Sequence, residues 1–359
     1  MTYRKILIRG GRIWDGTRFI SGDVAIGDGK ILAIGQAPDD FRAYLKYDAE
    51  GAIVSPGLVE LHAHLRYLSD PVYEANGEEA CFPCGVTTAA DAGTLFCCEM
   101  PAFSRLKIRM FPPVAVSDEA PDFSGVHAVR AYYGADRVPG IKVYYDRTVC
   151  GDRGLAPYRA ICDEAHRLGL IVMTHCSDCP VPMRDMFSCM EAGDISTHTY
   201  HNRGHSADED DLACLQEARE KGIILDLGFA HGYHADFALL RRALDRGLAP
   251  DTISCDLVSG HTQIKGALFG LSLAMSAMRM LGMGEEEILR AVTSAPANAL
   301  KITSGAGRLT VGAPADLCVL RSVPADYSVK DRAGNILHIT QAYQCALTVA
   351  DGCVVHRLD

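Results

Sequence analysis

The chain has 359 residues, 48% of them hydrophobic, and a formal net charge of -10. Acidic and basic residues are mixed along the chain, so no basic block indicates a nucleic acid or an anionic membrane as a partner. No apolar run approaches the length of a membrane span and the first residues lack an apolar signal segment, so we expect a cytoplasmic protein.

Eight apolar segments with the pattern of strands follow one another through the middle of the chain. They cover residues 52–64, 87–92, 107–117, 140–145, 170–176, 194–201, 223–228 and 252–257. The third segment is interrupted by Pro112 and Pro113, which cannot donate hydrogen bonds to an interior ladder.

Helical patterns separate the later strands and follow the last one. Residues 154–169, 208–222 and 236–247 have apolar side chains at helical spacing, and two more helices are expected at residues 270–281 and 285–300. Strands that alternate with helices predict parallel strands joined by right-handed crossovers. The pattern therefore predicts an α/β fold with a (β/α)8 TIM-type barrel.

Two histidines stand at the end of the first predicted barrel strand, in the order His62-Ala63-His64. Alternate residues of a strand share one face, so both imidazoles can reach a single metal ion. An HxH pair alone is weak, because two such histidines can also decorate the surface of a strand.

Four further candidate ligands lie in or at the end of later predicted strands: Lys142, His175, His198 and Asp256. In a barrel of parallel strands, every strand delivers its carboxyl end to the same rim, where reactive groups collect. Six polar side chains from five strands are therefore expected to converge. Asp91 also stands near a strand end, and there we expect a structural hydrogen-bonding role.

In the order of these residues, the chain resembles the binuclear, metal-dependent branch of the amidohydrolase superfamily, which includes dihydroorotases, hydantoinases and dihydroorotase-like deacetylases. The resemblance also implies a small β-sandwich built from both chain ends. Residues 6–16, 23–35 and 307–320 fit it. We expect residues 1–55 and 308–359 to form this composite domain and residues 56–307 to form the metal-dependent hydrolase barrel.

The resemblance implies a centre of two divalent metal ions, with zinc as the expected metal. His62, His64 and Asp256 would hold the more buried ion, and His175 and His198 the more exposed one. Lys142 would bridge both as a carbamate formed with CO2; the alternative is an ordinary lysine that pairs with Asp146 or with an acidic substrate. A hydroxide bridging the ions would be the nucleophile, with Asp256 as the catalytic general acid and base.

The substrate signal points to a small molecule that carries a carboxylate. Arg66 follows the HxH pair as in dihydroorotases, and a guanidinium binds a carboxylate with two parallel hydrogen bonds. Residues 87–93 and 253–257 are closer to the deacetylase-like group, which acts on acylated amino or hydroxy acids. The predicted contacts with substrate are Arg66, Tyr200, His201, Asn202, Arg203, His231 and His261.

Five histidines fall at or just after the ends of strands six to eight: His201, His205, His231, His234 and His261. We expect some of them to contact substrate, because that rim carries the reactive groups of a barrel. One departure from the family concerns Glu60, which stands where an aspartate is usual. The segment 65–80 matches neither subgroup well.

Three functions remain open from the sequence. The first is a binuclear hydrolase that cleaves an amide, a cyclic amide or an ester, by analogy expected to form a homo-oligomer. The second is a mononuclear deaminase on the same barrel, which would not need Lys142. The third is a non-catalytic oligomeric scaffold, whose mark would be missing ligands.

The 14 cysteines include two CxxC pairs, Cys81 with Cys84 and Cys176 with Cys179. The pairs are too far apart in sequence for a common zinc knuckle, and disulfide frameworks belong to small secreted chains. We therefore expect mostly buried free thiols.

Overall fold

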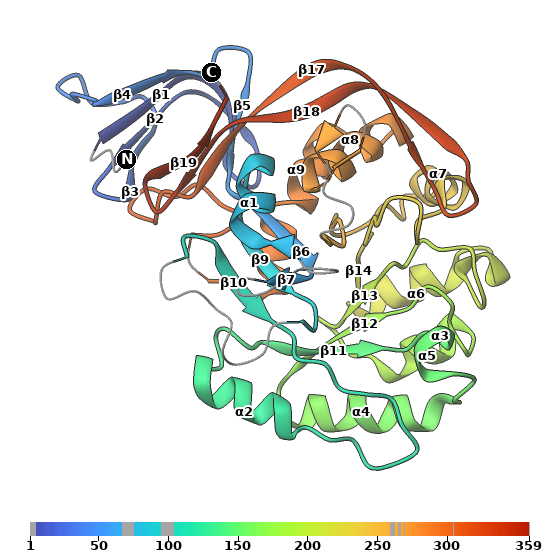
Figure 1. Cartoon of the computed structure of the whole chain (residues 1–359). Coiled ribbons are helices and arrows are strands. Elements are labelled where there is room, and N and C mark those ends of the chain that lie inside the picture. Colours follow the sequence, from blue (N-terminus) through green and yellow to red (C-terminus); the bar gives the residue numbers. More distant parts are fainter. Residues whose placement is uncertain are drawn as a thin grey trace.

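The computed structural model describes residues 5–66, 75–94, 104–258, 263–264, 267–268, 270–303 and 305–358, with the backbone alone described at residues 66, 75, 263, 264, 267 and 268. Figure 1 shows two parts, a β-sheet domain that contains both chain ends and an α/β barrel. The predicted fold class, an α/β TIM-type barrel with a small β domain built from both chain termini, is confirmed, and the predicted β-sandwich takes the form of a single sheet.

The terminal domain is one eight-stranded sheet, in which the strands from the C-terminal part of the chain form one group and those from the N-terminal part form another, joined at β5. Its strands are β1 (Lys5–Trp14), β2 (Phe19–Gly27), β3 (Lys30–Gly35), β4 (Leu45–Asp48), β5 (Ile53–Pro56), β17 (Leu317–Lys330), β18 (Ile336–Ala350) and β19 (Cys353–Arg357). β17 pairs antiparallel with β5, and β5 pairs parallel with β1. A separate apolar core, including Ile6, Val24 and Leu347, stabilises this sheet.

The hairpin of β17 and β18 reaches well beyond the terminal sheet. Its strands run along α8 (Leu271–Leu281) and end beside the loop that precedes α7 (Phe237–Asp245), as Figure 1 shows. At the tip, the backbone N–H of Gly232 donates to the carbonyl of Lys330 at 3.0 Å. Residues expected to serve only the terminal domain therefore also contact the barrel rim.

The barrel consists of eight parallel segments. Seven are assigned strands, β6 (Leu58–Ala63), β9 (Val86–Asp91), β10 (Lys107–Met110), β11 (Gly140–Tyr144), β12 (Ile171–His175), β13 (Ile195–Thr197) and β14 (Ile224–Leu225), and the eighth is the extended segment 252–257. They pair as β6–β9–β10 and as β11–β12–β13–β14. Three parallel bridges complete the ring: Pro113 with Lys142, Asp226 with Thr252, and Ala63 with Leu257.

The third barrel strand is shorter than predicted. β10 ends at Met110, so the predicted range to residue 117 is too long. Pro112 and Pro113 explain the break, because neither has an N–H group for the ladder. The carbonyl of Pro112 still accepts from the N–H of Lys142 at 3.0 Å, which keeps the segment beside β11.

Helices surround the barrel and fill the connections. They are α1 (Gly77–Cys81), η1 (Phe82–Cys84), α2 (Ser124–Tyr133), α3 (Arg147–Cys150), α4 (Leu155–Arg167), α5 (Met183–Cys189), η2 (Ala207–Asp210), α6 (Ala213–Lys221), α7, α8, α9 (Glu285–Ala291) and α10 (Ser294–Ala299). Two short pairs, β7 (Leu65–Arg66) with β8 (Ala75–Asn76) and β15 (Gln263–Ile264) with β16 (Ala267–Leu268), complete the described elements. The predicted helix 285–300 is two helices, separated at Val292 and Thr293.

Sequence pattern accounts for α4 and α7. α4 buries Tyr158, Ile161, Cys162 and Ala165, which lie at helical spacing on the face toward the strands. α7 begins where the carboxylate of Asp236 accepts from the N–H of Leu239 at 2.7 Å. Among the described helices, none combines the length and continuous apolar character that crossing a lipid bilayer requires.

Candidate metal centre

The six predicted ligands gather at the carboxyl ends of the barrel strands. His62 lies on β6 and His64 directly after it, Lys142 lies on β11, His175 ends β12, and His198 follows β13. Asp256 lies on the eighth segment, between the first and seventh strands of the ring. Every one of these side chains is buried except that of His175, which is partly exposed.

Asp256 is the meeting point of the cluster. Its Oδ1 lies 3.2 Å from Nε2 of His62 and 3.2 Å from Nε2 of His64, and its Oδ2 lies 3.9 Å from Nε2 of His198. Burial opposes ionisation of Asp256, but the neighbouring histidines hold its pKa well below the usual value. The carboxylate is therefore ionised at neutral pH.

Lys142 is fully buried and faces the same space. Its Nζ lies 2.9 Å from Nε2 of His62, whereas Asp146 caps α3 and contacts His175. Burial lowers the pKa of Lys142 to about 7, against the opposing charges of Asp256, Asp226 and Asp91. A substantial fraction of this amine is therefore neutral at neutral pH, and the neutral amine is the form that can form a bond to CO2.

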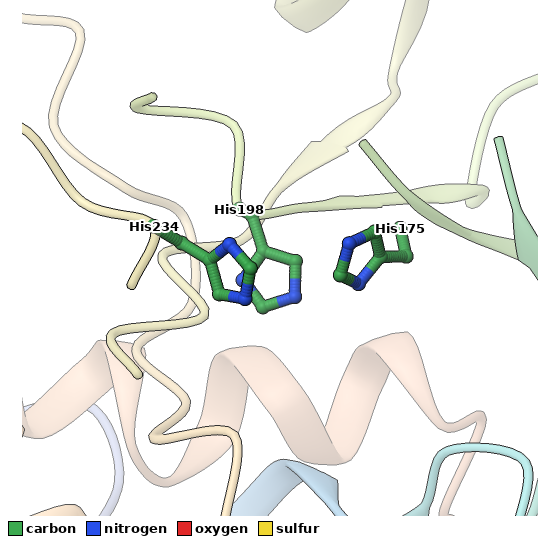
Figure 2. A group of neighbouring side chains, drawn as sticks. All are labelled: His175, His198 and His234. Carbon is green, nitrogen blue, oxygen red and sulfur yellow. The ribbon is translucent and has the colours of Figure 1, made fainter. Parts of the chain in front are cut away.

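His175 and His198 lie side by side across β12 and β13, with ring centroids 4.4 Å apart (Figure 2). Nε2 of His175 lies 3.5 Å from Oδ2 of Asp146, and Nδ1 of His198 donates to the carbonyl of Gly228 at 2.8 Å. In each ring the other nitrogen is left with a lone pair. For His198 that nitrogen, Nε2, is buried and has no hydrogen-bond partner among the described residues.

The donor set fits divalent metal ions of the borderline class. Two groups have ligand atoms within 4.8 Å of one another, His62 with His198 and Asp256, and His175 with His198 and His234. Burial, together with the charge of Lys142, holds the pKa of His62 well below its usual value, and burial together with His234 does so for the pKa of His198. Neutral imidazoles beside a carboxylate are the ligands that zinc and similar ions bind.

Comparisons with known proteins concern the sequence and the fold. A model described as "Amidohydrolase family" matches residues 251–356. The chain is 28% identical over 354 residues to a deacetylase of Agrobacterium fabrum, covering 90% of this chain and 84% of that protein. A dihydroorotase crystal structure superposes with a TM-score of 0.86 at 26% identity, covering 98% of each chain.

The chain belongs to the amidohydrolase superfamily. An adenine deaminase structure shares the fold at a TM-score of 0.81 and 23% identity, covering 97% of this chain and 98% of that chain. The prediction of a hydrolase of this superfamily is confirmed. Membership implies a divalent metal ion and a small-molecule substrate; the number and identity of the ions and the roles of single residues stay predictions.

A buried chain of hydrogen bonds orients the first histidine of this amidohydrolase. Nδ1 of His62 donates to Oγ1 of Thr197 at 2.9 Å, and Thr197 donates to Oδ2 of Asp226 at 2.8 Å. Asp226 also accepts from the hydroxyls of Thr252 at 2.7 Å and Ser254 at 2.6 Å. Because Nδ1 carries the proton, Nε2 of His62 presents its lone pair to the cluster.

Glu60, the departure from the family pattern, joins the first and eighth barrel segments. Its carboxylate accepts from the N–H of His62 at 2.9 Å and from the N–H of Cys255 at 3.1 Å. Burial raises the pKa of Glu60 to about 8, although these N–H groups favour the carboxylate. The Glu60 side chain thus connects the backbone at His62 with the backbone at Cys255, the residue before Asp256.

Two of the candidate ligands have a strained backbone. His198 has φ 63° and Asp256 has φ 53°, both in the left-handed region that costs a residue with a Cβ on the order of 1–3 kcal/mol. Each conformation turns the chain at the end of its strand and points the side chain over the barrel mouth. The adjoining Gly228 has φ 51°, and a Cβ there would lie 2.4 Å from Nδ1 of His198.

The predicted substrate-binding residues differ in burial and in the groups that they contact. Tyr200 is fully buried and donates its hydroxyl to the carbonyl of Leu248 at 2.9 Å, which favours a structural role. Asn202 donates to Oδ2 of Asp236 at 2.6 Å, and Nε of Arg203 lies 2.7 Å from Oδ2 of Asp178.

His201 and His231 are the other described members of this set. His201 is fully buried, and burial lowers its pKa to about 4. Nδ1 of His231 accepts from the N–H of Lys330 at the hairpin tip, at 3.2 Å. The side chain of Arg66 and all of His261 lie outside the described residues. Contact with substrate stays a prediction for the whole set.

Sequence reasoning left several residues of the centre without a specific role. Thr197, Asp226 and Gly228 were not singled out, and His234 appeared only as one of several histidines on the rim. Each lies within or just after a predicted strand end, so position relative to the rim was an available signal. Asp91, in contrast, has the structural role expected, because its carboxylate accepts from the N–H groups of Leu65 and Thr94, both at 2.9 Å. All 12 cysteines within the described residues are buried free thiols, as expected.

Proposed function

We propose that this amidohydrolase is a binuclear, metal-dependent deacylase that cleaves the amide or ester bond of a small acylated carboxylic acid. The observation that carries the proposal is the convergence of Lys142, Asp256 and four histidines in one buried cluster. Four imidazoles, one carboxylate and one lysine are too many donors for a single tetrahedral ion. Two ions would need an anionic ligand between them, and a carbamate on Lys142 would supply it.

In this proposal His62, His64 and Asp256 hold one ion, and His175 and His198 hold the other. When bound, two divalent ions lower the pKa of a water molecule and polarise a substrate carbonyl. The ligand assignment is supported by the contacts of Asp256 with His62 and His64, both 3.2 Å, and by the lone-pair nitrogen of His198.

Asp256 acts as the proton carrier. Its low pKa makes it a carboxylate at neutral pH, able to orient the attacking water and accept its proton as the oxygen bonds to the carbonyl carbon. The same proton then passes to the leaving nitrogen or oxygen as the acyl bond breaks. Without that transfer an amine would leave as a strongly basic anion.

Lys142 is proposed to carry a carbamate. The neutral amine bonds through Nζ to the carbon of CO2 and loses one proton, which turns the neutral side chain into an anionic carbamate that would serve as a ligand to both ions. Complete burial supports this, because a protonated amine in the same place would repel both metal ions. With carbon-13 bicarbonate, we expect a carbamate carbon resonance in the wild type that is absent in Lys142→Met.

The substrate class follows from two independent indications. The deacetylase similarity runs through 90% of the chain, and the sequence position of Arg66, two residues after His64, resembles that of a carboxylate-binding arginine in dihydroorotases. An N-acyl amino acid or an acylated hydroxy acid combines both features. A cyclic amide is the second candidate, favoured by the superposition with a dihydroorotase at a TM-score of 0.86.

A mononuclear deaminase is the remaining alternative on the same barrel. The adenine deaminase structure is similar in fold, at 23% identity. Lys142 argues against this function, because a single ion held by histidines and Asp256 leaves a buried lysine beside it without a purpose. A scaffold role is disfavoured since all six predicted ligands are present.

The experiment is a hydrolysis screen of zinc-loaded protein supplied with bicarbonate. Its panel contains N-acetyl amino acids, O-acetyl hydroxy acids, dihydroorotate, hydantoins and adenine, with Asp256→Asn as the matched control. We expect acyl release from one of the first two classes and loss of that activity in the control. Ring opening or ammonia release instead would replace the deacylase proposal with the corresponding alternative.

A further inference from the structure

His234 lies on the loop between β14 and α7 and faces the candidate metal centre, although it is not one of the six predicted ligands. Its Nε2 is 3.6 Å from Oδ2 of Asp256. Its ring lies 3.8 Å from that of His198 and 5.1 Å from that of His175, measured between centroids. Figure 2 shows the three rings gathered side by side.

We propose that His234 supplies a third imidazole to the metal ion held by His175 and His198. The inference rests on the binuclear centre proposed above and adds a ligand to it. The ligand atoms of these three histidines lie within 4.8 Å of one another. Zinc–nitrogen bonds of about 2.1 Å place two ligands of a tetrahedral ion about 3.4 Å apart, so modest side-chain rotation suffices.

The surroundings of His234 favour a ligand over a packed histidine. Its Nδ1 is buried and has no hydrogen-bond partner among the described residues, and its side chain is 14% exposed. A ring nitrogen buried without a partner costs free energy, which an ion bound nearby offsets. His234 thus lies beside two other imidazoles and a carboxylate, which are the groups of a metal-ligand shell.

The hairpin tip holds the loop of His234 in place. The N–H of Gly232 donates to the carbonyl of Lys330, and the N–H of Arg332 donates to the carbonyl of Ala235, both at 3.0 Å. The N–H of Phe237 donates to Oδ2 of Asp331 at 3.1 Å. These bonds on both sides of His234 fix its backbone, so the imidazole is positioned before a metal ion binds.

The test is an equilibrium zinc titration against a competing chelator, with the cobalt-substituted visible spectrum as a second readout. The variants are His234→Ala and His234→Gln, since glutamine keeps a hydrogen-bonding amide but is a poor zinc ligand. The control is His205→Ala, because His205 is on the same rim and pairs with Glu209 at 2.9 Å.

We expect His205→Ala to bind two ions, each with the same affinity as the wild type. Both His234 variants should bind the first ion normally and the second about 100-fold more weakly, with a changed cobalt spectrum for the second ion. Unchanged binding of the second ion in His234→Ala would overturn the inference. Full recovery in His234→Gln would also overturn it, because hydrogen bonding would then be the role of His234.

Failure of the binuclear centre itself gives a different result. A wild-type protein that binds only one ion refutes the binuclear proposal. The role of His234 is then tested by the affinity for that single ion. Weakening of its affinity in His234→Ala keeps the inference, and unchanged affinity overturns it.

Discussion

Replacing Gly228 by alanine tests whether the position of His198 depends on the backbone beside it. An added Cβ would lie 2.4 Å from Nδ1 of His198 and 2.6 Å from Oγ1 of Thr197. Ordinary contacts between such atoms are about 3.5 Å, so the imidazole has to move by about 1 Å. That shift disturbs the hydrogen bond from His198 to the carbonyl of Gly228, now 2.8 Å.

Two costs add in Gly228→Ala. The left-handed backbone, with φ 51°, costs alanine about 1–2 kcal/mol relative to glycine. Loss of the hydrogen bond adds about 1 kcal/mol. A catalytic group displaced by about 1 Å lowers turnover on the order of 100-fold, so kcat should fall by that factor in the fraction of the protein that stays folded.

The matched control is Gly247→Ala, at an exposed position after α7. Gly247 has φ 71°, but no atom lies within 4 Å of an added Cβ, so this variant carries the backbone cost alone. Denaturant unfolding, metal content and kcat are measured for both variants. We expect a similar backbone cost in both and loss of metal and turnover only in Gly228→Ala. Equal activity in the two variants would refute the proposed link between Gly228 and the position of His198.

Three further predictions concern proton transfer, substrate binding and stability. Asp256→Asn should keep the fold and much of the bound metal while kcat falls by about 1000-fold or more, and an unchanged kcat would remove Asp256 as proton carrier. Arg66→Ala should raise KM for carboxylate substrates more than for their carboxamide analogues; equal increases would contradict carboxylate binding. His166 has its pKa raised by the hydrogen bond to Asp194, 2.8 Å long, so its stabilising effect is complete below the ordinary histidine pKa and is lost as pH rises through the raised value. His166→Ala should therefore lower the free energy of unfolding by about 1 kcal/mol near pH 5.5 and by less near pH 9; an equal loss at both would count against the ion pair.

The barrel was predictable because its strands and helices have clear periodicities. The six predicted ligands lie in or next to predicted strands, so their positions follow from the barrel. The centre contains His62, Lys142 and Asp256 close together although they are far apart in sequence, as parallel strands with a common rim require. The end of β10 was harder to place, because two prolines allow a bridge to Lys142 without a continuous ladder. The contacts of the predicted substrate residues were the least predictable, since a loop side chain can contact many different neighbours.

The sequence by itself determined the alternation of strands and helices, the residues at the strand ends and the resemblance to a metal-dependent hydrolase. Only the tertiary structure decided that Thr197 and Asp226 orient His62, that Gly228 leaves room for His198, and that the hairpin tip holds the loop of His234. Periodicity is a local property, so it can be read from a single sequence. A hydrogen-bond partner or a close approach depends on which distant segments meet, and that is settled only when the ring of strands closes.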